Sequence, residues 1–340
     1  MFVRPHRKGM VPPCLYKSTR LNAFMRLKDV PEDFFVEEIP KRKFTEQGKL
    51  FVYTATKRDL TTNEMITKLS RLNGVQPRDI RFAGLKDRRA ITTQYITSPK
   101  ALTKSPDNVI LTLKGKTDEH LSLGDMQANA FRIVVRDVKD THDVVIPNYF
   151  GDQRFSKDNV EIGLLILKKD FYEVAKRLAE ENPAVADRLE QDRSSPIQAL
   201  QVFPFRILLL YVHAVQSWLY NEAVSAYIKD NHPDAREVPY RHGVLRFPKE
   251  LKDQEVPVVG AVQELGEWEK YYAPLLNEAG ITQQDFLIRS FPSLTQEGET
   301  RSLLADVKSH SIKREGPNAI VEVVLGSGCY ATVCVDGWCS

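Results

Sequence analysis

No aspartate or glutamate precedes Asp29 in this chain, and the first 28 residues carry seven lysines and arginines. Residues 1–100 hold 21 basic and 10 acidic residues, a balance of +11, whereas residues 101–340 hold 27 and 35, a balance of −8. A basic tail plus chance explains residues 1–28, but less readily residues 41–100, with 14 basic and 5 acidic residues. The segregation predicts that one part of the molecule faces a polyanion.

Long apolar runs are also missing. No stretch approaches the ~18 consecutive apolar residues that a membrane-spanning helix needs, and the longest candidate, 207–215, contains His213. The first residues, MFVRPHRKGMVPPC, lack the apolar centre of a signal peptide. A hydrophobic fraction of 42% is sufficient for folded cores, and 340 residues predict about two domains. We therefore expect a soluble cytoplasmic protein with no membrane partner.

The chain has only four cysteines, and three of them, Cys329, Cys334 and Cys339, recur every five residues near the C-terminus. A spacing of five places alternate side chains on opposite faces of a strand, and separates them by roughly 140° around a helix. There is no CxxC pair and no nearby histidine at zinc-finger spacing. We predict free, mostly buried thiols and no metal site; a metal-dependent enzyme that uses these cysteines is the alternative.

Alternating apolar residues and turn signals predict that the first 150 residues are mainly strands. The expected strands cover 34–39, 50–56, 80–83, 91–97, 108–113 and 131–135. One clear helix opens at Thr61, whose spacing to Glu64 is that of a capping box, and ends at Gly74. This half of the chain is therefore expected to form a sheet with one helix.

Helical patterns dominate the middle of the chain, with the strongest over 206–229. Strand patterns return after Thr300, at 303–307, 319–325 and 330–335. An order of strands, mixed elements and strands predicts one sheet domain that is interrupted by an insertion, rather than two domains in tandem.

The run FAGLKDRRAITTQ (82–94) is the candidate active centre. It places Asp87 between Lys86 and the pair Arg88 and Arg89, on a glycine-containing turn between two expected strands. A carboxylate in such a basic setting is a nucleophile, a general base or a salt-bridged loop residue. The residues alone favour the structural alternative, for the aspartate and for its basic neighbours.

Two further segments mix aromatic, amide and basic side chains, namely NAF (129–131) and NYFGDQRF (148–155). Aromatic faces stack on extruded bases and amides read base edges, so this composition suits nucleic acid. A core phenylalanine beside a polar turn accounts for the same pattern.

The run AGLKDRRAITTQ closely resembles the signature of the TruD family of tRNA pseudouridine synthases, Gly-x-Lys-Asp-x-x-Ala-x-Thr-x-Gln. Five other blocks resemble that family in the same order along the chain: PEDFFVEE (31–38), NAF (129–131), NYFGDQRF (148–155), YVHAVQSWLYN (211–221) and GCYAT (328–332). The resemblance covers about residues 30 to 332. It departs from the family pattern at Cys329, where serine is expected, and at Gly326, where proline is expected.

The resemblance implies an α+β fold, with a pseudouridine-synthase core whose mixed, largely antiparallel sheet is flanked by helices. The catalytic domain would comprise 29–155 and 298–340, and an inserted α/β lobe, the TRUD domain, would comprise 156–297. The basic arm 1–28 has no counterpart in the family pattern. We expect this arm to strengthen tRNA binding chiefly at low salt.

The same resemblance implies an isomerase that converts uridine to pseudouridine, at position 13 in the D arm of tRNA. Asp87 matches the catalytic aspartate, Phe131 the aromatic residue that stacks on the target base, and Asn129 a residue close to that base. Further substrate contacts are expected at Lys86, Arg88, Gln94, Arg154 and Tyr330.

The implied reaction breaks the C1′–N1 bond of uridine, turns the uracil and rejoins it through C5, so no metal, redox or small-molecule cofactor is expected. The chain also lacks the glycine-rich fingerprint of nucleotide-binding proteins. Attack of Asp87 on C1′, attack on C6 and removal of a 2′ proton all stay open. A non-catalytic RNA-binding protein on the same fold is the main alternative, and a monomer is the default oligomeric state.

Overall fold

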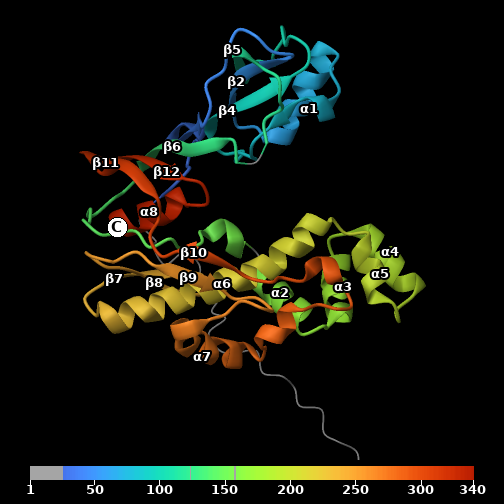
Figure 1. Ribbon diagram of the computed structural model, residues 1–340, viewed down its shortest axis with the longest axis vertical. Coiled ribbons are helices and arrows are strands. Elements are labelled where there is room, and N and C mark those ends of the chain that lie inside the picture. The colour runs from blue at the N-terminus through green and yellow to red at the C-terminus, as the bar shows by residue number, and fades with distance from the viewer. Residues whose placement is uncertain (1–25, 123, 157) are drawn as a thin grey trace, which may run out of the picture. The chain divides into compact units, whose positions relative to one another are not determined.

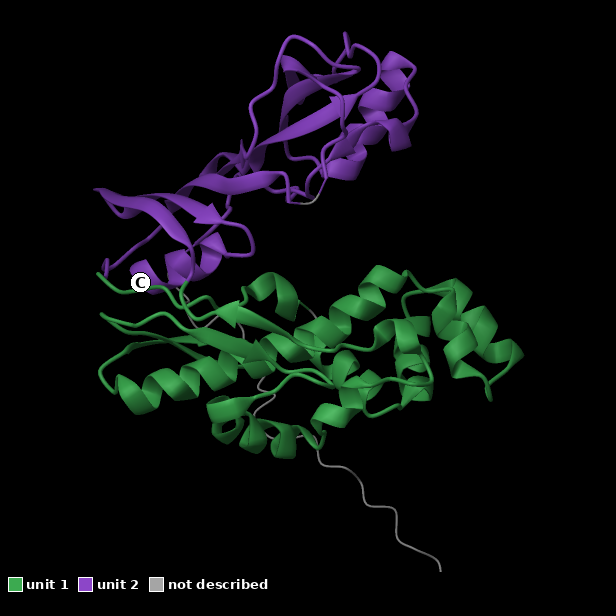
Figure 2. Ribbon diagram, in the orientation of Figure 1, with its two compact units in different colours: residues 1–22, 143–304 green, residues 23–142, 305–340 purple. Residues whose placement is uncertain are grey.

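The structure is a computed structural model that describes residues 26–122, 124–156 and 158–340 (Figure 1). These residues form two compact units (Figure 2). Unit 1 contains the described residues of 143–304, and unit 2 contains the described residues up to His142 together with 305–340. Unit 2 is thus assembled from both ends of the described chain.

Unit 2 is built on an eight-stranded mixed sheet with the order β11-β12-β6-β1-β4-β2-β5, to which β3 adds on β4. Within the described residues β1 and β4 pair in parallel and the other strand pairs of this sheet are antiparallel, so the expected mixed sheet is confirmed. The strands are β1 (Phe34–Pro40), β2 (Leu50–Arg58), β3 (Arg81–Phe82), β4 (Ile91–Ser98), β5 (Val109–Thr117), β6 (Met126–Val135), β11 (Val307–Glu315) and β12 (Asn318–Gly326).

Helix α1 (Thr62–Asn73) covers part of this sheet and has the predicted ends. The Thr61 backbone N–H donates to the Glu64 carboxylate at 2.8 Å, and the Glu64 N–H donates to the Thr61 hydroxyl at 3.2 Å. Gly74 ends the helix in the left-handed conformation, with φ of 59°. The apolar face of α1 packs on side chains of β2 and β4 in one buried cluster that includes Tyr53, Ala55, Met65, Ile66, Leu69 and Ile96.

Unit 1 is mainly helical. Its longest helix is α6 (Phe205–Asn231), which confirms the strongest helical prediction. Helices α2 (Asn159–Leu167) and α7 (Glu269–Ala279) pack against it, and α3 (Phe171–Ala179), α4 (Pro183–Gln191) and α5 (Pro196–Gln201) pack on one another. Two small antiparallel sheets complete the unit, formed by β7 (Arg236–Tyr240) with β8 (Gly243–Phe247) and by β9 (Glu255–Val258) with β10 (Glu299–Ser302).

The C-terminal strand predictions need correction. Of residues 330–335, expected as a strand, all but Tyr330 lie in helix α8 (Ala331–Trp338), because burial of Ala331, Val335 and Trp338 outweighs the local strand preference of Thr332 and Val333. Residues 303–307 mostly join β10 to β11. The edge strand β11 was missed, since its sequence VKSHSIKRE is largely exposed and lacks regular apolar alternation.

Along the chain, the boundaries between the two units fall at His142/Asp143 and Leu304/Ala305. The domain boundaries expected from the sequence were 155/156 and 297/298. Two contacts tie the intervening residues to unit 1. The Phe150 N–H donates to Asn221 Oδ1 of α6 at 2.9 Å, and β10 pairs with β9. Among the described helices, none is at once long enough and apolar enough to cross a bilayer.

Candidate active site

Asp87 lies on the turn between β3 and β4, at the end of the sheet where β4 begins. Because β1 and β4 run parallel, with Phe35 opposite Ile91, the segments that precede both strands come to the same end of the sheet. The residues before β1 are therefore neighbours of the Asp87 turn, although about 60 positions separate them. The side chain of Asp87 is 45% exposed.

Lys28, in the segment before β1, reaches the carboxylate of Asp87. Its Nζ lies 2.6 Å from Asp87 Oδ2 and 4.0 Å from the centre of the Phe34 ring. The Phe34 ring in turn meets the ring of Phe131 edge to face, with centroids 6.0 Å apart and planes at 72°. A cation over an aromatic face and edge-to-face rings are both favourable contacts. Asp87 and Phe131 are therefore linked through two intermediate side chains.

Two interactions anchor the segment that carries Lys28. Arg26 and Arg136 form a two-way backbone bridge, with N···O distances of 3.2 and 3.1 Å. The Arg136 guanidinium also donates twice to the buried carboxylate of Asp33, at 2.9 and 2.6 Å, and lowers the pKa of Asp33 against the effect of its burial. Lys28 thus lies in a segment that is hydrogen-bonded to the residue after β6.

Lys86 and Gln94, both predicted to contact substrate, have partners inside unit 2. The Lys86 ammonium lies 2.6 Å from Glu38 Oε1, whose carboxylate is fully buried and accepts the Tyr95 N–H at 2.7 Å through Oε2. Gln94 is fully buried and bonded to the hydroxyl of Thr62 at 2.8 Å. Gln94 Nε2 also donates to the carbonyl oxygen of Gly84 at 3.4 Å, so Lys86 and Gln94 both tie the turn to the sheet.

The backbone of the turn has partners as well. The Lys86 N–H donates to the Thr62 hydroxyl at 2.9 Å, at the start of α1. Lys57 of β2, whose side chain is fully buried, donates from Nζ to the carbonyl oxygen of Asp87 at 2.7 Å. Arg88, which is exposed, forms an ion pair with Glu64, the capping residue of α1. The turn is therefore fastened to β1, β2, β4 and α1.

Asn129 and Phe131 lie on β6, next to β1. Phe131 is opposite Val36 of β1 and Val323 of β12, and Asn129 is opposite Glu38, the partner of Lys86. Within the described part of the chain, the buried Oδ1 of Asn129 has no hydrogen-bond partner. Phe131 thus belongs to the set of contacting side chains that includes Asp87, Lys28 and Phe34, and Asn129 precedes it by two residues on the same strand.

Tyr330 immediately precedes α8 and is half-buried. It follows the end of β12, where Gly326 is opposite Ala128 of β6, and its carbonyl oxygen accepts the Val333 N–H at 3.1 Å. Tyr330 therefore belongs to unit 2, beside the end of β6 that leads to Asn129.

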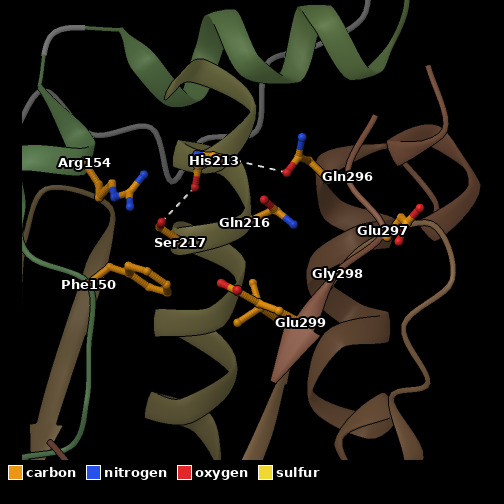
Figure 3. Close-up of a pocket in the computed structure, with 10 residues that line it drawn as sticks. Phe150, Arg154, His213, Gln216, Ser217, Gln296, Glu297, Gly298 and Glu299 are labelled. Carbon is orange, nitrogen blue, oxygen red and sulfur yellow. Dashed lines mark hydrogen bonds between the residues drawn. The ribbon is translucent and has the colours of Figure 1, made fainter. Parts of the chain in front are cut away.

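Arg154 belongs to unit 1, where it lines a cavity of about 210 Å³ (Figure 3). The cavity is also lined by Phe150, His213, Gln216 and Glu299. His213 is bonded to Gln296 at 3.0 Å, and burial lowers its pKa, which favours the neutral imidazole. Figure 3 shows the Arg154 guanidinium and the Glu299 carboxylate entering from different sides, which provides both donors and acceptors.

The cysteines near the C-terminus lie within unit 2. Cys334 and Cys339 are buried and Cys329 is half-buried, and within the described residues none of the three forms a disulfide. Burial raises the pKa of the Cys334 thiol. In residues 26–340, apart from the two undescribed positions, no group of three or more His, Cys, Asp or Glu side chains is placed to hold a metal ion.

Sequence reasoning missed Lys28, Lys57 and Glu38 as members of this site. Lys28 was assigned to the basic arm, and Lys57 was counted only as part of the basic balance of residues 41–100. The signal for Lys57 was its position in the apolar strand LFVYTATKR, where a lysine in the interior of a sheet needs a partner. That partner is a backbone carbonyl, which no residue pattern reveals.

Comparison with known proteins matches this chain to one family. The model of the family "tRNA pseudouridine synthase D (TruD)" matches residues 13–184, 173–240 and 253–336, so the expectation that the basic arm has no counterpart in the family is wrong for residues 13–28. The tRNA pseudouridine synthase D of Aquifex aeolicus is 30% identical over 298 residues, covering 69% of this chain and 77% of its own. That of Syntrophotalea carbinolica is 25% identical over 377 residues, covering 90% and 94%.

The fold is shared with a solved structure. A TruD crystal structure from Methanosarcina mazei superposes with a TM-score of 0.69 and 22% identity, over 95% of each chain. The family model covers most of the chain, and the fold of the chain agrees with that of the solved TruD structure. On these grounds the chain belongs to the TruD family of tRNA pseudouridine synthases and is an isomerase.

Proposed function

We propose that Asp87 is the catalytic carboxylate with which this enzyme isomerises a uridine of tRNA to pseudouridine. The observation that carries the proposal is the linked group Asp87, Lys28, Phe34 and Phe131 at one end of the unit 2 sheet. A carboxylate that is 45% exposed, and held by a lysine beside an aromatic pair, is accessible to a base that has left its stack.

The reaction is an internal rearrangement. The C1′–N1 bond of the uridine breaks, the uracil turns while it is held, a bond forms between C1′ and C5, and the proton of C5 is finally transferred to N1. Atoms and electrons balance without an external reactant. Asp87 acts at C1′, at C6 or on a 2′ proton, and Lys28 fixes the position of its carboxylate in each case.

Phe131 supplies the aromatic wall on which the target base stacks, and Asn129 lies two residues away on the same strand with an amide oxygen available for the imide N–H of uracil. Arg88 and Tyr330 are further contacts to the RNA. Lys86 and Gln94 act on the substrate through the turn that they hold.

In this proposal unit 2 is the pseudouridine-synthase core and unit 1 is the inserted TRUD domain. The cavity around Arg154 then receives a second part of the tRNA, while lysines and arginines of both units contact phosphates. The target is uridine 13 in the D arm, as the family resemblance implies.

The test is a site-resolved map of pseudouridine on unmodified tRNA transcripts, with the wild-type enzyme and Asp87→Asn. The amide keeps the size of the side chain but removes its charge, so we expect pseudouridine at position 13 with the wild type and a rate at least ~10³-fold lower with the variant. Equal rates would refute the role of Asp87. If Asp87→Asn still promotes the folding of tRNA but no longer makes pseudouridine, the protein has an RNA-binding activity that is separate from catalysis.

A further inference from the structure

Lys57 occupies an unusual position for a lysine. It is the penultimate residue of β2, opposite Thr92 of β4 and Val109 of β5, and its side chain is fully buried. Removing an ammonium group from water is costly unless strong hydrogen bonds compensate. The surroundings of Lys57 must therefore contain partners for its charge.

Those partners are backbone oxygens of the Asp87 turn. Nζ of Lys57 lies 2.7 Å from the carbonyl oxygen of Asp87 and 3.4 Å from that of Lys86. Both distances describe contact with the peptide groups on either side of the Asp87 Cα, not with the carboxylate. The ammonium group of Lys57 thus binds the backbone of Asp87, the residue whose carboxylate is the proposed catalytic group.

The charged groups that face Lys57 come from two elements. Asp87 and Lys86 lie on the turn, and Glu64 lies on α1. The facing residues of β4 and β5, Thr92 and Val109, do not titrate. Burial lowers the pKa of Lys57 to about 8, against the opposing attraction of Asp87, so the group is mostly protonated at pH 7 and loses its proton as pH rises through about 8.

We propose that Lys57 is a positioning residue for catalysis, whose buried ammonium fixes the backbone of residues 86–87 and thereby aims the Asp87 carboxylate. This inference rests on the proposed role of Asp87. Lys28 restrains the carboxylate from the solvent side, and Lys57 restrains the peptide from inside the sheet. A neutral amine keeps its N–H donors but loses the charge, so its hold on the two carbonyls is weaker.

The first test compares Lys57→Met with a matched control, Tyr53→Phe. Tyr53 lies four residues earlier on β2, is buried, and accepts the Leu102 N–H through its hydroxyl at 3.0 Å, away from the Asp87 turn. Both variants leave a buried polar backbone group without its partner and so lose stability. Single-turnover rates and tRNA affinities are measured on folded protein, below the unfolding midpoint of each variant.

We expect Lys57→Met to lower the single-turnover rate about 100-fold, because a shift of ~1 Å in a catalytic group has an effect of that order. The affinity for tRNA should stay within about threefold. Tyr53→Phe should keep the wild-type rate. Equal rates for Lys57→Met and the wild type, or equal losses in the two variants, would overturn the proposal.

The pH dependence of the rate distinguishes a positioning role of Lys57 from a general loss of structure in the variant. The rates of the wild type and Lys57→Met are compared from pH 6.5 to 9.5 on the same tRNA, so that titration of the RNA cancels in their ratio. The ratio should shrink at least threefold as pH rises through about 8, because only the wild type has this proton to lose. A constant ratio would contradict the inference, whereas an active Asp87→Asn enzyme in the same assay would refute the proposed function itself.

Discussion

Three lysines surround Asp87, and each has a different partner. Lys28 pairs with the carboxylate, Lys57 binds the carbonyl oxygen of the same residue, and Lys86 pairs with the buried Glu38 below the turn. The basic residues near the aspartate are therefore not equivalent contacts for phosphate. Lys28 and Lys57 both contact residue 87 itself, one at its carboxylate and the other at its carbonyl oxygen.

Replacing Lys28 by methionine should separate the effect on catalysis from the effect on folding. The ion pair with Asp87 is partly exposed, with side chains that are 20% and 45% accessible, so its loss should change the free energy of unfolding by no more than about 1 kcal/mol. The rate of the chemical step should fall at least tenfold, because the carboxylate loses its restraint. Single-turnover kinetics together with urea denaturation measure both quantities.

Arg58→Met is the matched control for Lys28→Met. Arg58 forms an ion pair of the same length with Glu32, at 2.6 Å, with both side chains about half exposed. A control that slows the chemical step as much as Lys28→Met would show that the loss is not specific to the Asp87 pair.

The sequence identified Asp87, Asn129 and Phe131 as candidates because they lie in recognisable blocks. It did not reveal Lys28 or Lys57, because their contacts join positions about 59 and 30 residues apart in the chain. Only the parallel pairing of β1 and β4 brings the first of these together with the turn. A pattern of residue types along the chain does not contain that pairing.

Strands and helices with a strong periodic pattern were predicted well. The capping box of α1, its terminal glycine and the long helix α6 agree with the sequence because each depends on neighbours along the chain. The failures, α8 and β11, depend on packing and on edge exposure instead. Local preference is overridden where a short segment is surrounded by the rest of a unit.

The packing of α2 against α6 provides a test of unit 1. A Cβ added at Gly163 would lie 2.6 Å from Val215 Cγ2, and closer still to the backbone oxygen of Tyr211. We expect Gly163→Ala to destabilise the protein by about 1–3 kcal/mol, because α2 must move away from α6. Alanine is the better helix former by roughly 1 kcal/mol, so a loss of stability cannot come from helix propensity.

Thermal unfolding of Gly163→Ala is best compared with Gly84→Ala. At Gly84 the added Cβ would meet nothing nearer than the flexible end of Lys86, at 3.9 Å. The second variant should unfold within about 0.5 kcal/mol of the wild type. If Gly163→Ala is equally stable, the close approach of the two helices does not constrain unit 1.

The uneven charge of the chain can be assigned to its two units. The described part of unit 2 includes residues 26–100, from the strongly basic first third of the sequence, and these residues carry Asp87 and its lysines. Residues 1–25 lie outside the described chain, and the proposal that they bind RNA phosphates rests on their composition, with five lysines and arginines and no acid.

The basic arm includes residues that belong to the active site and residues that lie outside the described chain. Residues 26–28 are bridged to β6 and place Lys28 on Asp87, so a truncation must stop at residue 25 to leave the active site intact. Deleting 1–25 should flatten the dependence of log tRNA affinity on log salt by roughly 0.7–0.9 for each phosphate that the arm neutralises, while the rate at saturating tRNA stays unchanged. A full-length variant with glutamine at the five basic positions of 1–25 separates charge from length and should show the same flattening. An unchanged slope in both proteins would mean that the arm does not bind RNA, and a lower saturating rate would mean that it also acts on the Asp87 site.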